Sequence, residues 1–342
     1  MRNKKNITKK GIFKKIFVKL CRLVGYEIID QRNFYFPVSN KTSKDNLSIL
    51  GESSISLPLG KTDITRPVKS LHVIIKTCTS VNLVTQNKKR IFEMSKSEYT
   101  FRTINSLINS LNFNKDLLQK IKIKITVIDH NSKNQDLLFI KNKLEKSNLN
   151  FEIINLDMSE FNHIKVINKN NPQIENNMKS TMASILKSFQ VAKDSSFDLF
   201  YFVEDDYIHK NNCLPEMIYT YEKLASESKK ELFLCPVDYP YLYTNSEKSD
   251  ILLGHNYHWR SVKETLLTFM SSKIMIEKHW KKLTKMCEQE QSPFETPLHE
   301  IFKTEICLSP IPSLAMHCTN VNSVFGLSPL IEWKKIWEEN EY

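Results

Sequence analysis

Short apolar runs alternate with segments of helical periodicity between residues 71 and 238. Clustered apolar residues are typical of buried strands, and apolar residues every three or four positions are typical of helices. The pattern predicts strands at 71–76, 122–130, 150–157, 198–206 and 231–238. It predicts helices at about 97–112, 134–146 and 177–193, and another from about 215. Because strands that alternate with helices form right-handed βαβ units, we expect an α/β fold whose mixed, mostly parallel sheet is flanked by helices.

The remaining sequence divides the 342 residues into four parts. Residues 1–25 form a basic amphipathic segment, and 26–70 are predicted to be a linker that packs across the domain, with a hairpin near 54–66. Residues 71–330 then make one large domain, and 331–342 a C-terminal tail.

The N-terminal segment predicts an amphipathic helix. Its apolar residues recur at helical spacing, with basic residues between them: Ile12, Phe13, Ile16, Phe17, Leu20 and Leu23 against Lys14, Lys15, Lys19 and Arg22. The run is too short and too charged to span a bilayer, which takes about 20 apolar residues. It also lacks the small-residue cleavage site of a signal peptide. We expect this helix to lie on an anionic membrane surface; a helix docked on the domain itself, or a disordered basic tail, is the alternative.

Charge and composition exclude several other classes. The formal net charge is +11, but the first 26 residues hold nine Lys or Arg and no acid, so the rest is close to neutral. The basicity therefore does not indicate nucleic-acid binding. Six glycines and no glycine-rich loop argue against a dinucleotide or P-loop fold. Seven widely spaced cysteines without C-x-x-C argue against a disulfide framework or structural zinc and favour a reducing cytoplasm.

Small polar and acidic residues follow the predicted strands, at the edge where parallel sheets bind ligands. They are Thr77, Cys78 and Thr79; Asp129 and Asn131; Asp157; and Glu204, Asp205 and Asp206. Any one acid there can be a simple helix cap. Three adjacent carboxylates repel one another unless a cation neutralises them. We therefore expect a divalent ion, Mg²⁺ or Mn²⁺, which takes one or two carboxylates plus substrate phosphates.

The run DLFYFVEDDY at 198–207 resembles the D-x-D segment of GT-A glycosyltransferases, in an E-D-D form. IIKTCTS after the first strand is similar to that family's opening loop, and VIDHNS after the second to its acidic step beside the nucleotide base. The helix with Asn177, Ser180 and Thr181 also fits. The resemblance covers roughly 71–325 and implies a Rossmann-type GT-A domain that binds a nucleotide-sugar, with a UDP-sugar favoured.

Position by position, the resemblance implies a role for each strand-end residue. Asp206 would contact the metal directly, and Glu204 and Asp205 would touch the ribose or the metal's waters. The other donor-binding candidates are Thr77, Cys78, Thr79, Asp129 and Asn131, with Thr77 and Asp129 lining the base and ribose pocket. Arg90 and Arg102 are weaker candidates for diphosphate or base contacts, since either can be a surface charge.

The second half of the chain supplies further candidates. His258 and Trp259 are expected at the acceptor, because aromatic faces often pack on sugar rings, and Arg260 is expected at the donor phosphates. A core Trp and a surface Arg are the alternative. Thr268, Phe269 and Met270 are predicted to end a strand that faces the cleft.

A general base and a second metal ligand complete the expected site. SPFETPLHEIF at 292–302 predicts a helix capped by Thr296 with Pro297 at its first position, which leaves Glu295 in a loop. An inverting transferase needs a carboxylate to take the acceptor's proton. Glu295 is the first candidate and Glu300 the second, although the family's usual acidic pair is broken here by Thr296. His317 is expected to complete the metal shell, unless it is a structural histidine.

Taken together, the sequence predicts a metal-dependent glycosyltransferase, most simply an inverting hexosyl- or N-acetylhexosaminyl-transferase. The acceptor would be a surface glycan or a lipid-linked intermediate in polysaccharide biosynthesis, reached from the inner face of the membrane. A nucleotidyltransferase that makes nucleotide-sugars is the first alternative, although it usually has a glycine-rich loop where this chain has KTCTSVN. A membrane-attached binding module without catalysis is the second.

Overall fold

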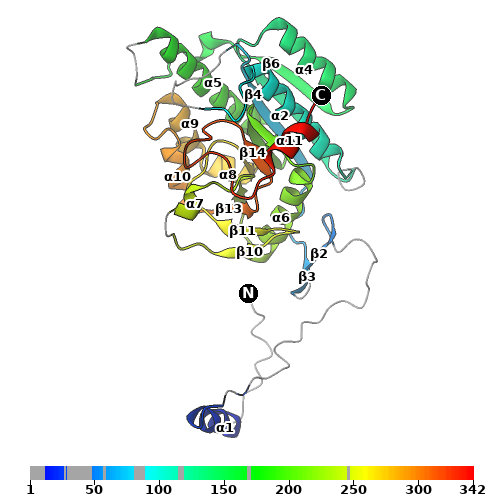
Figure 1. Ribbon diagram of the computed structural model, residues 1–342, viewed down its shortest axis with the longest axis vertical. Helices are drawn as coiled ribbons and strands as arrows, with labels where there is room; N and C mark the ends of the chain where they lie inside the picture. Colours follow the sequence, from blue (N-terminus) through cyan, green and yellow to red (C-terminus); the bar gives the residue numbers. More distant parts are fainter. Residues whose placement is uncertain are drawn as a thin grey trace.

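A nine-stranded mixed sheet forms the centre of the computed structural model (Figure 1). The structure describes residues 12–26, 28, 48–56, 59–80, 89–114, 119–167, 171–244 and 247–342. Most of the predicted linker before residue 48 lies outside these ranges. The strands follow the order β10-β11-β13-β9-β12-β7-β4-β5-β6. Their bounds are β4 Ser70–Thr77, β5 Lys122–Asp129, β6 Asn150–Asn155, β7 Leu199–Glu204, β9 Leu232–Leu234, β10 Ile251–Leu253, β11 His258–Ser261, β12 Phe269–Ser272 and β13 Ile306–Ile311.

Seven of these nine strands run in one direction, and only β11 and β12 oppose them. The predicted fold class, a mostly parallel sheet flanked by helices, is therefore confirmed. Since β12 is antiparallel to β7, it begins rather than ends at the edge where β4, β5 and β7 finish. Thr268 thus lies at that edge, but the prediction that 268–270 end a strand was wrong.

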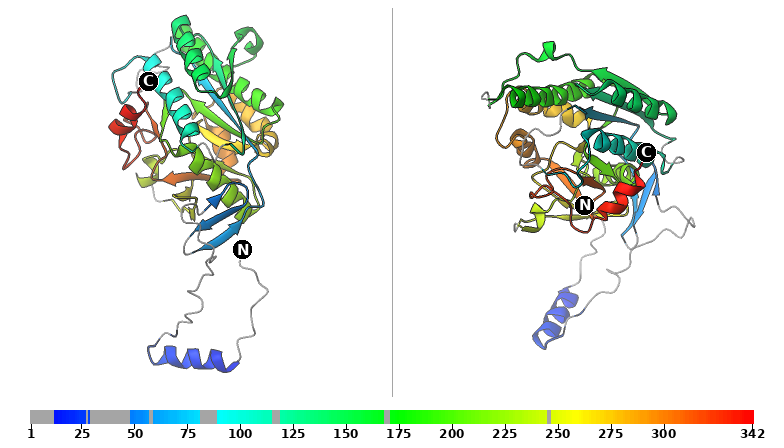
Figure 2. Two further views of the ribbon diagram at one scale, coloured as in Figure 1. Left: turned by 90° about the vertical axis from the view of Figure 1, so that its right-hand side faces the viewer. Right: turned by 45° about the horizontal axis from the view of Figure 1, so that its top comes forward.

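Helices cover both faces of the sheet (Figure 2). One face packs on α2 Lys96–Asn112, α4 Asn134–Lys146 and α6 Cys213–Ser228. The other packs on α5 Pro172–Asp194, α8 Lys273–Lys278, α9 Trp280–Glu288 and α10 Thr296–Phe302. Alternate residues of one strand serve the two layers, as a pleated strand requires. In β4, Val73 and Ile75 face α2 and α6, whereas Ile74 faces α5.

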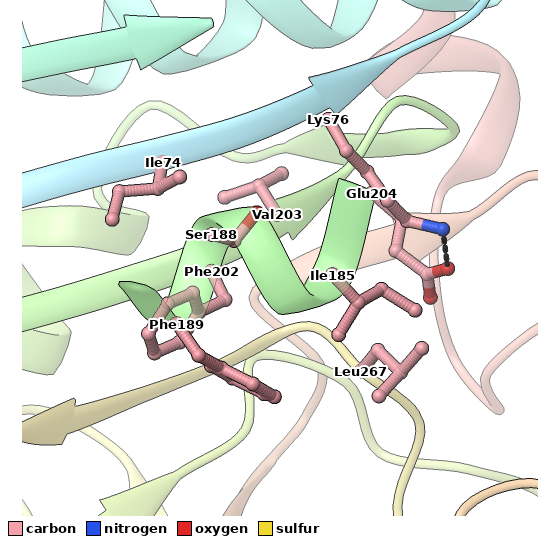
Figure 3. A pocket seen from close by; sticks show the side chains of 9 residues that line it. All are labelled: Ile74, Lys76, Ile185, Ser188, Phe189, Phe202, Val203, Glu204 and Leu267. Atoms are coloured by element: carbon pink, nitrogen blue, oxygen red, sulfur yellow. Dashed lines mark ion pairs between the residues drawn. The ribbon is translucent and has the colours of Figure 1, made fainter. Parts of the chain in front are cut away.

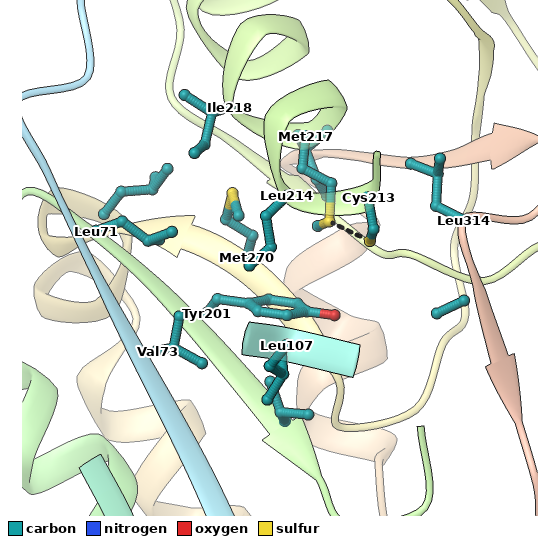
Figure 4. Close-up of a cluster of buried hydrophobic side chains, with 14 of the residues drawn as sticks. Leu71, Val73, Leu107, Tyr201, Cys213, Leu214, Met217, Ile218, Met270 and Leu314 are labelled. Atoms are coloured by element: carbon teal, nitrogen blue, oxygen red, sulfur yellow. Dashed lines mark hydrogen bonds between the residues drawn. The ribbon is translucent and has the colours of Figure 1, made fainter. Parts of the chain in front are cut away.

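The layer against α2 and α6 is well packed around aromatic and sulfur side chains (Figure 4). Tyr201 of β7 is fully buried there among Leu71, Val73, Leu107 and Met217. Because both faces of the central strands are covered, these strands read as continuous apolar runs in the sequence.

Smaller elements are fastened to this body. The predicted hairpin is confirmed by β2 Ser53–Ser56 and β3 Gly60–Asp63, which join β1 Ser48–Ile49 in a three-stranded sheet. The carboxylate of Glu222 on α6 accepts hydrogen bonds from the Gly51 and Val68 N–H groups and ties this segment to the body. A two-stranded sheet pairs β8 Tyr207–His209 with β14 Ala315–His317.

The last twelve residues pack on the domain. They contain α11 Trp333–Glu339, whose Trp337 packs against Tyr99 of α2. The Trp337 carbonyl accepts a hydrogen bond from the Arg102 guanidinium, and the ring lies 4.3 Å from that group. The remaining described elements are η3 Met158–Phe161, α7 Tyr241–Thr244 and the separate helix α1 Ile12–Leu23. No helix in the described ranges combines the length and apolar character needed to cross a bilayer.

Candidate functional site

The strand ends of the sheet bring the acidic candidates to one edge, but they divide them between its faces. In β7, Phe200 and Phe202 belong to the layer on α5, and Tyr201 and Val203 to the layer on α2. This alternation continues into the acids, because Glu204 contacts Lys76 beside α5 and Asp205 contacts α2. Asp206 follows in the turn to β8. The three carboxylates therefore occupy three different environments.

Glu204 forms an ion pair with Lys76 of the neighbouring strand, with Nζ 2.9 Å from Oε1 (Figure 3). Both side chains are about four-fifths buried. Burial would lower the pKa of Lys76, but the attraction of Glu204, Asp205 and Asp206 outweighs it and raises that pKa. The pair borders a small cavity of about 20 Å³, otherwise lined mainly by apolar side chains of β4, β7 and α5. The Glu204 N–H donates to the Thr268 hydroxyl.

Asp205 is held by the first turns of α2. Its Oδ1 lies 2.5 Å from the Lys96 ammonium, and its Oδ2 accepts the Thr100 hydroxyl at 2.8 Å. The Cys78 N–H also donates to Oδ2, at 3.3 Å. Asp205 thereby joins the loop after β4 to α2, and its carboxylate already has an ammonium partner.

Asp206 faces His317, which β14 brings beside β8. The His317 ring stacks on Tyr207 with centroids 4.6 Å apart, and its Nδ1 lies 2.9 Å from the Phe325 carbonyl. Since a carbonyl only accepts, Nδ1 carries a proton, and Nε2 is directed at Asp206 Oδ2, 3.7 Å away. Burial would lower the pKa of His317, but Asp206 outweighs it and raises that pKa. Burial would raise the pKa of Asp206, yet His317, Lys96 and Thr319 hold it well below its ordinary range.

These contacts correct one step of the sequence argument. We expected a cation to relieve the repulsion among three adjacent carboxylates. Instead, Lys76 neutralises Glu204, and Lys96 neutralises Asp205. Of the three acids, only Asp206 faces its partner at more than hydrogen-bonding distance, with His317 Nε2 3.7 Å from its Oδ2. A role of Glu204 or Asp205 at the ribose or at metal-bound water would require them to act beside their lysines.

The donor set at Asp206 nevertheless suits a divalent ion. One carboxylate oxygen and one imidazole nitrogen face each other, and the other ring nitrogen is hydrogen-bonded to a carbonyl, as is common for metal-ligating histidines. In the described part of the chain, no three His, Cys, Asp or Glu side chains are grouped as an all-protein metal site would need. Mg²⁺ commonly takes only one or two protein carboxylates and completes its shell with phosphates and water. The residues present are compatible with that mode of binding.

The candidates after β4 and β5 form a hydrogen-bonded network. Asp129 accepts the Thr77 hydroxyl at 2.6 Å and the Ser132 hydroxyl at 2.5 Å. The Thr79 N–H donates to Ser132, and the Thr79 hydroxyl accepts from the Lys133 N–H. Asp129 and Thr77 are both buried. They therefore fix the two loops, whereas the Asn131 side chain, at φ +64°, is exposed to solvent.

Arg260 forms a buried ion pair with Asp238 beside the half-exposed ring of Tyr243. Its guanidinium is ion-paired with Asp238 and lies 4.3 Å from the Tyr243 ring, whose hydroxyl donates to Asp238. Burial raises the pKa of Asp238 despite these partners. Arg260 is only 8% exposed, so the alternative prediction of a surface arginine was wrong. Its charge is nevertheless already balanced by Asp238.

Trp259 is a correction to the expected acceptor site. Its side chain is fully buried, and its indole Nε1–H points at Glu216 of α6. It cannot stack on a sugar, because β11 turns alternate residues to opposite faces and places Trp259 in the core. His258, one position earlier, is exposed at the start of β11.

The remaining candidates lie at the start of α10 or on it, or make contacts that serve the fold. Glu295, half-buried, is itself the residue before α10, so the helix begins at Thr296 rather than after it as predicted. Glu300 is exposed on α10. Arg102 fastens α11, and Arg90 lies over the Tyr99 ring, so both have structural contacts. Asp157 caps η3 by accepting a hydrogen bond from the Ser159 N–H, so it is a simple helix cap, as an acid after a strand can be.

Sequence reasoning missed Lys76, Lys96 and Asp238. Lys76 had a usable signal, since a lysine inside the apolar run LHVIIK is expected only beside an acid. Asp238 also follows a predicted strand and had the same signal as Asp129. Lys96 had none, because nothing local shows that α2 brings it to Asp205.

No protein-family model matches the chain, and no curated protein matches it. Solved structures with a similar fold include S. aureus TarS, at 13% identity over 61% of this chain and 29% of that one, with a TM-score of 0.34. They also include galactosyltransferase LgtC, at 8% identity over 69% and 67% of the two chains (TM-score 0.34). A UDP-glucose pyrophosphorylase complexed with UDP-glucose matches at 9% identity over 80% and 97% (TM-score 0.40). The similar structures thus include both glycosyltransferases and a pyrophosphorylase.

Proposed function

We propose that this protein is a metal-dependent GT-A glycosyltransferase that moves a sugar from a nucleoside diphosphate sugar to a glycan or lipid-linked acceptor. The observation that carries the proposal is the meeting of Asp206 and His317 at the carboxyl edge of the sheet, beside the loops after β4 and β5. In such sheets ligands bind beyond the strand ends. The absence of glycine from KTCTSVN disfavours the nucleotidyltransferase alternative.

Asp206 and His317 would hold Mg²⁺ or Mn²⁺, and the ion would supply neutralising charge to the leaving diphosphate. The chain's own residues would do the rest. The loops carrying Thr77, Cys78, Thr79 and Asn131 would bind the nucleoside, with Asp129 keeping them in place. For an inverting transfer, Glu295 or Glu300 would take the proton of the acceptor hydroxyl.

Nucleotide binding is the first test. Calorimetric titration with UDP, GDP, CDP and dTDP, with and without Mn²⁺, should show metal-dependent binding of one diphosphate, most simply UDP. Asp206→Asn should weaken it at least tenfold, since a neutral amide replaces the charged ligand. Asp63→Asn is the matched control, because its side chain is 82% exposed on β3. Equal affinity in Asp206→Asn and Asp63→Asn, or no binding with metal, would refute a donor site here.

A second assay separates transfer from nucleotide-sugar synthesis. In one reaction the protein is incubated with UTP and hexose 1-phosphates, and the release of pyrophosphate is measured. In a second reaction it is incubated with UDP-sugars, and the release of UDP is measured. We expect UDP release only. If the donor is turned over, Glu295→Gln and Glu300→Gln form a matched pair, and loss of roughly 10²–10⁴-fold in one of them identifies the base.

A further inference from the structure

Helix α1 lies apart from the other described elements (Figures 1 and 2), and its apolar face is exposed. Phe13, Phe17 and Leu20 are 87%, 59% and 56% exposed, and Ile16 and Leu23 are also exposed. These positions are three or four residues apart and share one side of the helix. Contiguous exposed apolar surface of this kind marks an interaction site.

The opposite side of α1 is basic. Lys15, Lys19 and Arg22 are exposed and fall between the apolar positions, and no acid occurs before Glu27. We propose that α1 docks flat on an anionic phospholipid surface, with its apolar face among the acyl chains and its basic side chains at the lipid phosphates. An amphipathic helix with a strongly basic polar face is the type that lies in a membrane interface.

The geometry favours this orientation over spanning. Twelve residues at 1.5 Å per residue give a helix of about 18 Å, well short of a hydrocarbon core about 30 Å thick. Lying flat, the same helix buries its apolar side chains and keeps its ammonium and guanidinium groups in the headgroup layer. Long basic side chains reach that layer from a buried helix by extending their stems.

Charge also disfavours a second copy of this chain as the partner. Two α1 helices packed face to face would bring together two segments that each hold nine basic residues and no acid within the first 26. Stable helix pairs usually set opposite charges beside the apolar seam. An anionic lipid surface supplies both the apolar phase and the opposite charge.

The test is co-sedimentation of the full chain with vesicles of phosphatidylcholine alone and of phosphatidylcholine with phosphatidylglycerol. We expect strong binding only to the anionic vesicles, weakened by salt. Phe17→Ser should reduce the partition coefficient roughly tenfold. Lys15→Glu with Lys19→Glu should reduce it at least as much, since each basic residue near such a surface contributes about fivefold.

Matched controls come from α4, outside the proposed surface. Leu138 is 59% exposed, and the Lys141 side chain is 58% exposed. Leu138→Ser therefore removes an exposed apolar side chain, and Lys141→Glu reverses an exposed charge. Both should bind vesicles within about twofold of the unaltered protein. The proposal is overturned if anionic vesicles bind no protein, if Phe17→Ser and Leu138→Ser behave alike, or if neutral vesicles bind equally well.

Light scattering at increasing protein concentration tests the second copy. A self-association abolished by Phe17→Ser, without vesicle binding, would assign the apolar face to another chain and overturn the membrane proposal. Vesicle binding does not depend on nucleotide or turnover. Its failure therefore says nothing against glycosyl transfer, and a failure of nucleotide binding says nothing against membrane docking.

Discussion

The ammonium of Lys96 is expected to stabilise the fold by neutralising Asp205. Lys96→Met removes that charge and keeps most of the aliphatic stem. The two side chains are only 12% and 11% exposed, and their charged atoms are 2.5 Å apart. Breaking a buried pair by removing one partner typically costs 3–5 kcal/mol. Asp205 keeps its bonds from Thr100 and Cys78, so we expect the free energy of unfolding to fall by about 2–3 kcal/mol.

Urea denaturation of four proteins isolates the interaction: the unaltered chain, Lys96→Met, Asp205→Asn and the double variant. The coupling energy of this cycle should be about 1–3 kcal/mol, because the two groups are in direct contact. Lys61→Met is the surface control. Its pair with Asp63 spans 3.3 Å, but the side chains are 49% and 82% exposed, so the loss there should stay below about 0.5 kcal/mol.

Adding Mn²⁺ to the same series tests which cation neutralises Asp205. If Lys96 does so, Mn²⁺ does not change how far the free energy of unfolding of Lys96→Met lies below that of the unaltered chain. The reasoning is refuted if Lys96→Met is as stable as Lys61→Met, or if Mn²⁺ restores its stability, since the metal would then hold the carboxylate that we assign to the lysine.

Three further perturbations have defined outcomes. Glu216→Leu leaves the partly buried N–H groups of Asn256 and Tyr257 without their acceptor, whereas the His255 N–H keeps the Thr220 hydroxyl, and it should lower the free energy of unfolding by roughly 2 kcal/mol or more, read by urea denaturation. Gly254→Ala places a methyl group against the Trp259 ring and should cost about 1–3 kcal/mol in the same assay, with no loss contradicting the packing described. Burial lowers the pKa of His209 to about 3, so the unfolded chain binds the extra proton between pH 6.5 and 3 and stability falls as the pH falls through that range. The loss should reach roughly 2 kcal/mol by pH 5, and His209→Gln should flatten the profile of unfolding free energy against pH; an unchanged slope would exclude His209 as its source.

The central sheet was predictable because its strands are buried on both faces and its helices are amphipathic. The helix at 134–146 was predicted with the bounds that α4 has. The errors concern the residues at which elements begin and end. The helix predicted from 177 begins at Pro172, where the side chain of Asn171 accepts the N–H groups of Gln173 and Ile174. The strand predicted to end at 206 ends at Glu204, because the chain turns there and begins β8 at Tyr207.

The meeting of the strand-end residues at one edge was predictable from the sequence, but their contacts were not. The carboxyl ends of β4, β5 and β7 do meet at one edge, as parallel pairing requires. The partners of the acids come from other elements, however: Lys96 from α2 and His317 from a strand more than a hundred residues later. Burial is equally non-local, and nothing within the segment HNYHWRS shows that Trp259 faces the core and His258 the solvent.

Three consecutive acids at a strand end therefore do not constitute one anionic site. The pleat sends Glu204 to one face of the sheet and Asp205 to the other, and each meets a lysine there. Asp206 lies in the turn between β7 and β8, and the antiparallel pairing of β8 with β14 brings His317 close to it. If this edge binds a metal as proposed, binding should depend on the β8–β14 pairing as much as on the Asp206 carboxylate, and the two lysine-paired acids should matter first for the stability of the neighbouring loops.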